Sequence, residues 1–300
     1  MSDQYNTDFR EMTRLSEEDK AYAEEFAKTI DLSAVTAVVQ YGAVPQKRVT
    51  DFPVSSLYST SDRELKEICE IMETLVKALN TFRTDYDSSD EIRRNDDSSA
   101  EMFRSLYEKA ERKADEAARR LEISRSSLIR DMKTLEGLYQ KGMNIIKEFD
   151  LYILAGKICL DTSAAELLKE KNEKAERTGL LEDSLSAKDY QDACSRFEKK
   201  LSDLSVSRQI PLQICMQIRL QQNNDSMMAD SLRTLTANAF PLWKNRICLS
   251  AGVNPQGQPG LITAEQFHEA NDALISTLNN MIALRETGLN KRRNALDSLF

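Results

Sequence analysis

The residues best suited to chemistry lie in a stretch that predicts a helix and is unusually rich in arginines and amides: Arg208, Gln213, Gln217, Arg219, Gln221, Gln222, Asn223 and Asn224. At about 100° per residue, Arg208, Arg219 and Asn223 fall within roughly a 60° arc. Gln213, Gln217 and Asn224 fall within another arc of about 40°. Guanidinium and amide groups make directional hydrogen bonds. The pattern therefore predicts either a partly buried polar network that sets helix register or a groove that binds an anion or a partner.

A second unusual segment follows, Phe240-Pro241-Leu242-Trp243-Lys244-Asn245, and it holds the only tryptophan of the chain. Pro241 predicts a kink or a restart of the helix, because proline disfavours helical conformation in the residue before it. Pro211 predicts a kink in the preceding helix for the related reason that it removes a backbone hydrogen bond. Trp243 is either a core anchor or a plate that stacks on a ligand.

Other chemistry has little support. His268 is the only histidine, which excludes a histidine-rich metal site, and between Glu265 and Glu269 we expect it to be solvated. Five cysteines without a Cys-x-x-Cys pair predict reduced thiols. The acidic residues between Asp85 and Asp97 lack the order of a calcium loop, and no glycine-rich phosphate loop occurs. We expect no catalytic residue, no metal and no cofactor.

Composition sets the fold class. Of 300 residues, 41% are hydrophobic and 30% charged, with nine glycines and six prolines, too few turn formers for a many-stranded protein. The net charge of −8 argues against binding to nucleic acid or to anionic membranes. No apolar run is long enough for a transmembrane span, and the polar start lacks a secretion signal. We expect a cytoplasmic protein.

Helical periodicity runs along most of the chain. We expect helices over 16–30, 31–41, 61–82, 100–122, 124–174, from 186 onward, 228–249 and 263–298, with Gly42, Pro45 and Gly179 as stops. The predicted divisions are a disordered N-terminus at 1–15, a helical region at 16–83, an acidic flexible linker at 84–99 and a long-helix bundle at 100–300. The predicted fold is all-α: an elongated antiparallel bundle with coiled-coil-like packing and a smaller N-terminal helical segment.

Four segments carry a family resemblance: RFEKKLSDLSVSRQIPLQICMQIRLQQNND with its continuation to FPLWKN, LEGLYQKGMNIIKEFDLYILAGK, the front from Tyr41 to Phe52, and ANDALISTLNNMIALRETGLNKRR. Together they resemble the TelA-type toxic-anion (tellurite) resistance family over about residues 20 to 295. The chain departs from the family at the Pro/Gly loop 251–260 and at 84–99, which puts a role of those tips in doubt.

The resemblance implies a role in bacterial tellurite resistance and stress response without an established reaction. It makes the signature positions candidates for binding: Arg208, Gln213, Gln217, Arg219, Gln222, Asn223, Asn224, Trp243, Lys244 and Asn245. Three hypotheses remain open. The first is a helical interaction scaffold for other stress-response proteins, the second is direct oxyanion binding or sequestration, and the third is thiol-dependent tellurite reduction at Cys215. A homo-oligomer is possible, although no heptad run compels one.

Overall fold

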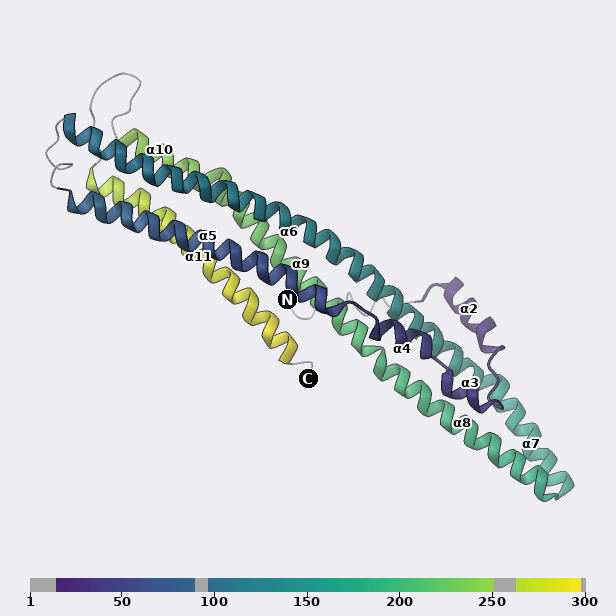
Figure 1. Ribbon diagram of the computed structural model, residues 1–300. Helices are drawn as coiled ribbons and strands as arrows, with labels where there is room; N and C mark the ends of the chain where they lie inside the picture. Colours follow the sequence, from purple (N-terminus) through teal and green to yellow (C-terminus); the bar gives the residue numbers. More distant parts are fainter. Residues whose placement is uncertain (1–14, 90–96, 251–262, 298–300) are drawn as a thin grey trace. The chain divides into compact units, whose positions relative to one another are not determined.

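The computed structural model describes residues 15–89, 97–250 and 263–297. Every regular element in these ranges is a helix, which confirms the all-α prediction (Figure 1). The elements are α2 Glu17–Ala27, α3 Val35–Gln40, α4 Ala43–Thr50, α5 Val54–Ser88, α6 Asp97–Cys159, the π-helical turn η2 Leu160–Ala164, α7 Ala165–Thr178, α8 Leu181–Ser207, α9 Gln209–Thr234, a second π-helical turn η3 Leu235–Ala239, α10 Phe240–Ser250 and α11 Ala264–Asp297. Within the described ranges no helix is long and apolar enough to cross a membrane.

The chain forms two compact units, and each is discontinuous in sequence. Unit 1 contains Met1–Val54 and Gly137–Met216, and unit 2 contains Ser55–Glu136 and Gln217–Phe300. The predicted boundary at 84–99 lies within unit 2 of this division. Part of the predicted linker is helical, because α5 continues to Ser88 and α6 begins at Asp97. Asp and Ser cost a helix only fractions of a kcal/mol each, so a polar stretch does not by itself end one. The predicted disordered residues 1–14 and the middle of the predicted linker, 90–96, lie outside the described residues.

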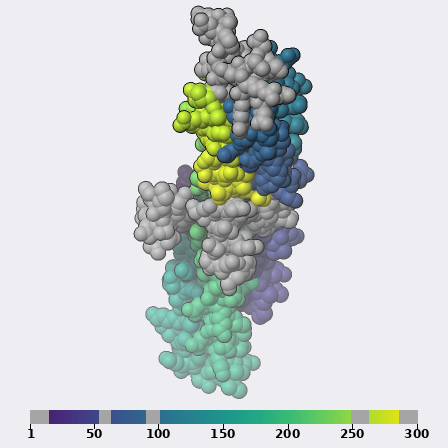
Figure 2. All heavy atoms as spheres, turned by 90° about the vertical axis from the view of Figure 1, so that its left-hand side faces the viewer, coloured from purple at the N-terminus to yellow at the C-terminus, as the bar shows by residue number. Residues whose placement is uncertain are grey.

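An aromatic core holds unit 2 together. Phe82 of α5, Phe103 of α6 and Phe267 of α11 pack with ring centroids 5.0 to 6.2 Å apart, and Trp243 of α10 meets Phe82 edge-on. Large aromatic side chains bury more apolar surface than any others, so these four rings join four helices. In Figure 2 the atoms of α11 (yellow) lie against those of α5 (blue), where Arg83 and Asp272 form an ion pair at 2.8 Å.

Unit 1 is built on the hairpin of α7 and α8, whose atoms also lie side by side in Figure 2. Gly179 joins the two helices with a left-handed φ of 61°, which confirms the predicted helix stop. Tyr41, directly after α3, connects the N-terminal helices to α8 and α6. Its ring packs against Phe197 of α8 at 4.8 Å, and its hydroxyl donates a 2.6 Å hydrogen bond to the Tyr152 carbonyl of α6.

Prolines lie in the first turn of three helical segments. Pro211 and Pro241 each occupy the first turn of a helix, α9 and α10. In a first turn the missing N–H costs nothing, so the predicted kink at Pro211 is a one-residue break at Arg208. At Pro241 the helix does not restart, because Thr234 and Phe240 are both in helical conformation and η3 leads directly into α10. The prediction that Pro45 ends a helix was wrong: Gly42 ends α3 with φ 71°, and Pro45 lies in the first turn of α4.

Candidate functional site

The signature residues belong to the end of α8, to α9 and to α10, and the two units share them. Arg208 and Gln213 belong to unit 1, whereas the positions from Gln217 to Asn245 belong to unit 2. Their surroundings are therefore considered unit by unit.

In unit 1, Arg208 pairs with Asp150 of α6. Its Nε donates to Asp150 Oδ1 at 2.5 Å and its Nη2 donates to Oδ2 at 3.1 Å. The two side chains are only 18% and 17% exposed. Burial raises the pKa of the Asp150 carboxyl, and the hydrogen bond and charge of Arg208 oppose that rise. A bidentate pair with this little solvent fixes the position and angle of one helix relative to the other.

In unit 2, Arg219 makes the equivalent contact with a different carboxylate. Its Nη1 lies 2.6 Å from Glu136 Oε2 and 2.7 Å from Gln222 Oε1. The Gln222 amide in turn donates to Glu136 Oε2 at 3.1 Å and to the Met132 carbonyl of α6 at 3.2 Å. The signature arginine and glutamine therefore bind one stretch of α6 jointly.

A buried amide and carboxylate complete the polar side of α9. Gln221 donates to Asp225 Oδ1 at 2.7 Å, and both side chains are buried. A buried polar pair inside a core is positioned by its mutual hydrogen bond, since separating the two groups would leave both of them buried without it.

The signature segment on α10 has the same character. Trp243 is 2% exposed and packs on Phe82 and Tyr107, so the interpretation as a core anchor holds for this residue. Lys244 Nζ lies 2.5 Å from Asp115 and 3.3 Å from Glu111, both on α6. Although burial lowers the pKa of Lys244, hydrogen bonds and charges from these two carboxylates outweigh it, and the net shift is upward.

The uncharged signature residues differ in accessibility. Gln213, Gln217 and Asn224 are half-buried, whereas Asn223 and Asn245 are exposed. The structure thus directs all three cationic signature residues toward carboxylates of α6, and it leaves amides on the outside. For Arg208, Arg219 and Lys244 this geometry matches the register interpretation of the polar pattern.

The contact of Lys244 with two carboxylates supports a prediction on stability. Replacing Lys244 with methionine keeps the packing of the stem but removes the charge between Asp115 and Glu111, and we expect a loss of about 1 kcal/mol. Urea unfolding followed by circular dichroism measures it. The matched control is Lys109→Met, an exposed lysine of α6 with no ion pair in the described ranges, which should change stability by less than about 0.5 kcal/mol. Equal effects of the two variants would contradict a structural role of Lys244.

The remaining candidates for chemistry are enclosed or paired. Cys215 is 0% exposed and its Sγ lies 3.8 Å from the Tyr139 carbonyl. His268, predicted to be solvated, is half-buried, and its Nε2 lies 3.1 Å from Asp87 Oδ1. In the ranges that the structure describes, no group of three or more His, Cys, Asp or Glu side chains could hold a metal ion.

Comparison with known proteins decides the family. The model of the toxic anion resistance protein family, TelA, matches residues 23–258. The chain belongs to the TelA family. Its relatives include the uncharacterized protein Lmo1967 of Listeria monocytogenes, 29% identical over 94% of this chain and 73% of the relative, and the uncharacterized protein YaaN of Bacillus subtilis, 26% identical over 95% and 85%. A TelA-like protein of Staphylococcus epidermidis is 25% identical over 79% and 65%. No solved structure matches the chain.

Sequence reasoning found the TelA signature cations but not their partners, the acidic residues Glu111, Asp115, Glu136 and Asp150 of α6. These carboxylates are spread along a charge-rich helix and look like solvated surface residues. The sequence did hold a signal for one of them: Asp150 lies between the apolar residues Phe149 and Leu151, directly before the stretch Leu-Tyr-Ile-Leu-Ala-Gly.

Proposed function

We propose that this TelA-family chain acts in resistance to toxic anions as a helical interaction protein of the cytoplasm, with other stress-response proteins as its partners. The observation that carries the proposal is that Arg208, Arg219 and Lys244 are each paired with carboxylates of α6. Ion pairs of this kind hold neighbouring helices in position rather than bind a ligand. The signature residues that are exposed are the amides Asn223 and Asn245. Exposed amides suit hydrogen bonding at a protein interface.

The two alternative mechanisms have weaker support. An oxyanion bound to the Nε and Nη2 side of Arg208 would have to displace the Asp150 carboxylate, which already takes donors from both of these nitrogens and would be left largely buried without a partner. A reductant must present its thiolate to tellurite, and Cys215 is 0% exposed. We therefore place direct oxyanion binding second and thiol-dependent reduction third.

The test combines resistance with capture of partners. A strain lacking the protein would be complemented with tagged wild type, with Asn223→Ala/Asn245→Ala, or with Lys109→Ala/Arg112→Ala, a control that removes two exposed side chains of α6. Under tellurite we expect the wild type and the control to retain the same partners and resistance, and the amide variant to lose both. Crosslinking before lysis keeps weak partners attached.

Two results would overturn the proposal. One is full resistance in the wild type with no protein enriched above an untagged strain. The other is binding of tellurite to the purified chain by calorimetry, abolished by Arg208→Met/Asp150→Leu but not by the amide variant, which would establish the oxyanion mechanism instead.

A further inference from the structure

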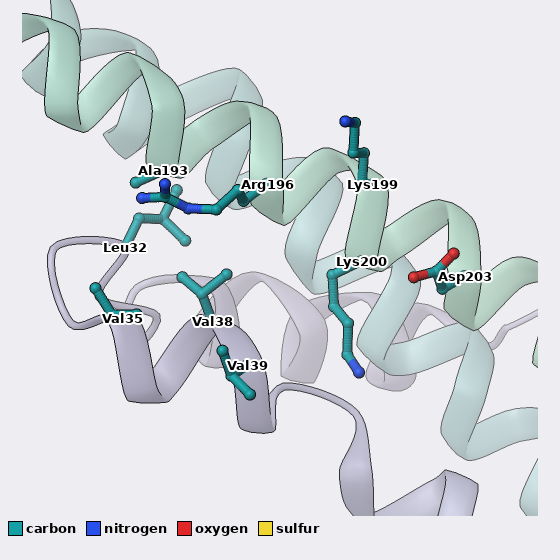
Figure 3. A pocket seen from close by; sticks show the side chains of 9 residues that line it. All are labelled: Leu32, Val35, Val38, Val39, Ala193, Arg196, Lys199, Lys200 and Asp203. Atoms are coloured by element: carbon teal, nitrogen blue, oxygen red, sulfur yellow. The ribbon is translucent and has the colours of Figure 1, made fainter.

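An open groove separates α3 from α8 in unit 1 (Figure 3). Leu32 and Val38 form its buried floor, at 2% and 7% exposure, whereas Val35 and Val39 stand out at 63% and 67%. The groove has a volume of about 270 Å³ and joins a second hollow of about 530 Å³ beside the start of α8, where Leu185 is 51% exposed. Two valines and a leucine this exposed around one groove form an apolar surface that an additional helix could cover.

The outer face of α8 along this groove carries two acidic side chains followed by two basic ones, with a fifth charge, Asp203, after them. Asp189 and Asp192 come first, and Arg196 and Lys199 follow. At about 100° per residue the four lie within an arc of about 80°. All four are exposed, and none has an ion pair in the described part of the chain. In Figure 3 Arg196 reaches along the groove above Leu32, while Lys199 points away from α3.

Within the helix this order contains both attractive and repulsive neighbours. Asp192 and Arg196 are opposite charges four residues apart, which supports the helix. Asp189 and Asp192 are like charges three residues apart, and so are Arg196 and Lys199, and these neighbours repel one another. The arrangement therefore favours a partner that presents the opposite order of charge.

A second copy of the same helix, running antiparallel, presents that order. Under a two-fold axis that crosses the charged face at the level of residue 194, Asp192 meets Arg196 of the copy and Asp189 meets Lys199 of the copy, because both pairs are centred on that level. Each pair then occurs twice, as a two-fold contact requires. The exposed Val35, Val39 and Leu185 lie on or beside this face and lose contact with water.

We propose that the chain forms a two-fold symmetric dimer through α8 and the adjoining groove, with α8 of the two copies antiparallel. The apolar side chains supply most of the affinity, and the charged pairs set the direction and register of the helices, as exposed ion pairs at interfaces do. The inference does not rest on the proposed function, because it concerns the protein alone.

Charge inversion tests the pairing directly. Arg196→Glu/Lys199→Glu makes all four positions acidic, and Asp189→Lys/Asp192→Lys makes all four basic. In sedimentation velocity over a dilution series we expect the wild type to dimerise and each variant alone to dissociate at least about tenfold more readily. Mixing the two variants should restore a dimer, now heterodimeric, because an acidic face then meets a basic face. Circular dichroism checks that each variant is folded.

The matched control is Lys109→Glu/Lys113→Glu on α6, which changes the net charge by the same amount as the acidic variant. It should dimerise like the wild type. A wild type that stays monomeric throughout the series would overturn the proposal, and so would two variants that each dimerise normally or that fail to combine when mixed. The Val35→Ser/Val39→Ser variant should weaken the dimer without any change in charge, and an unchanged dimer there would rule out the groove.

Discussion

Replacing Arg208 with alanine should lower the free energy of unfolding by about 3 kcal/mol. The change leaves Asp150, whose side chain is 17% exposed, as a carboxylate without its cation. Removing one partner of a largely buried pair is costly because the remaining charge has lost both water and its counter-charge. The measurement is urea unfolding of the wild type and the variant, followed by circular dichroism, with the midpoint and slope compared.

Two further variants separate this cost from a general loss of arginine. Arg112→Ala removes a cation whose side chain is 78% exposed and which pairs with Glu108 within one helix, and it should cost less than about 0.5 kcal/mol. Arg208→Met/Asp150→Leu removes both charges and fills the space, and we expect it to recover most of the stability. If Arg208→Ala cost no more than Arg112→Ala, the pair with Asp150 would not hold α6 against the end of α8.

The loss caused by Arg208→Ala should shrink as the pH falls. Burial raises the pKa of Asp150 in the folded protein, and Arg208 opposes that rise; without Arg208 the pKa therefore rises further. A carboxyl whose folded pKa is raised contributes stability below its unfolded pKa and loses that contribution as the pH rises through the folded pKa. The gap between wild type and variant should thus be larger at neutral pH than under mildly acidic conditions. With Asp150→Asn in both proteins nothing titrates at this position, so the gap between Asp150→Asn and Arg208→Ala/Asp150→Asn should stay constant with pH.

The features that the sequence predicts well are decided within a few residues. Ser16 caps α2 through a reciprocal capping box with Asp19, and Gln266 and Thr263 bond each other's backbone N–H at the start of α11. Gly179 ends α7. In each case the side chain acts on a backbone group of its own turn, so no knowledge of the tertiary structure is needed.

Helix length depends on distant contacts, and the sequence did not predict it for α6. α6 is one helix of 63 residues, where two helices were expected, at 100–122 and 124–174. Ser124, expected to start the second of them, is instead 3% exposed inside this one helix. Propensities differ by less than about 1 kcal/mol between most residues, so burial against other helices decides such cases. The same reasoning explains why the polar end of α5 stays helical to Ser88.

The candidate site shows the same limit. The residues between Arg208 and Asn224 were identified from their type and spacing, but the prediction placed both arginines on one continuous helix. The break at Arg208 invalidates that common arc, and the arginines meet different carboxylates, Asp150 and Glu136, in different units. Which carboxylate faces which arginine depends on helix register, which residue spacing within one helix does not encode.

Replacing each of two glycines of α6 with alanine should change the stability of the protein in opposite directions. Gly137 has nothing within 4 Å of the position where a Cβ would lie, so Gly137→Ala should stabilise the helix by up to about 1 kcal/mol. At Gly142 a Cβ would lie 2.5 Å from Cys215 Sγ, and Cys215 is 0% exposed and has no room to move aside. Gly142→Ala should therefore destabilise the protein by about 2 kcal/mol, because overpacking outweighs the gain in helix propensity.

A second substitution identifies the cause of the Gly142 effect. Cys215→Ala removes the sulfur that occupies the space, so Gly142→Ala/Cys215→Ala should regain most of the stability lost in Gly142→Ala. The double-mutant cycle measures this coupling in thermal and urea unfolding, and additive effects would show that the two residues do not touch. A strong coupling would make the thiol of Cys215 the packing partner of a close approach between α6 and α9. That role explains why a cysteine inside the signature helix is wholly enclosed: a small apolar side chain is what the bare backbone at Gly142 can accommodate.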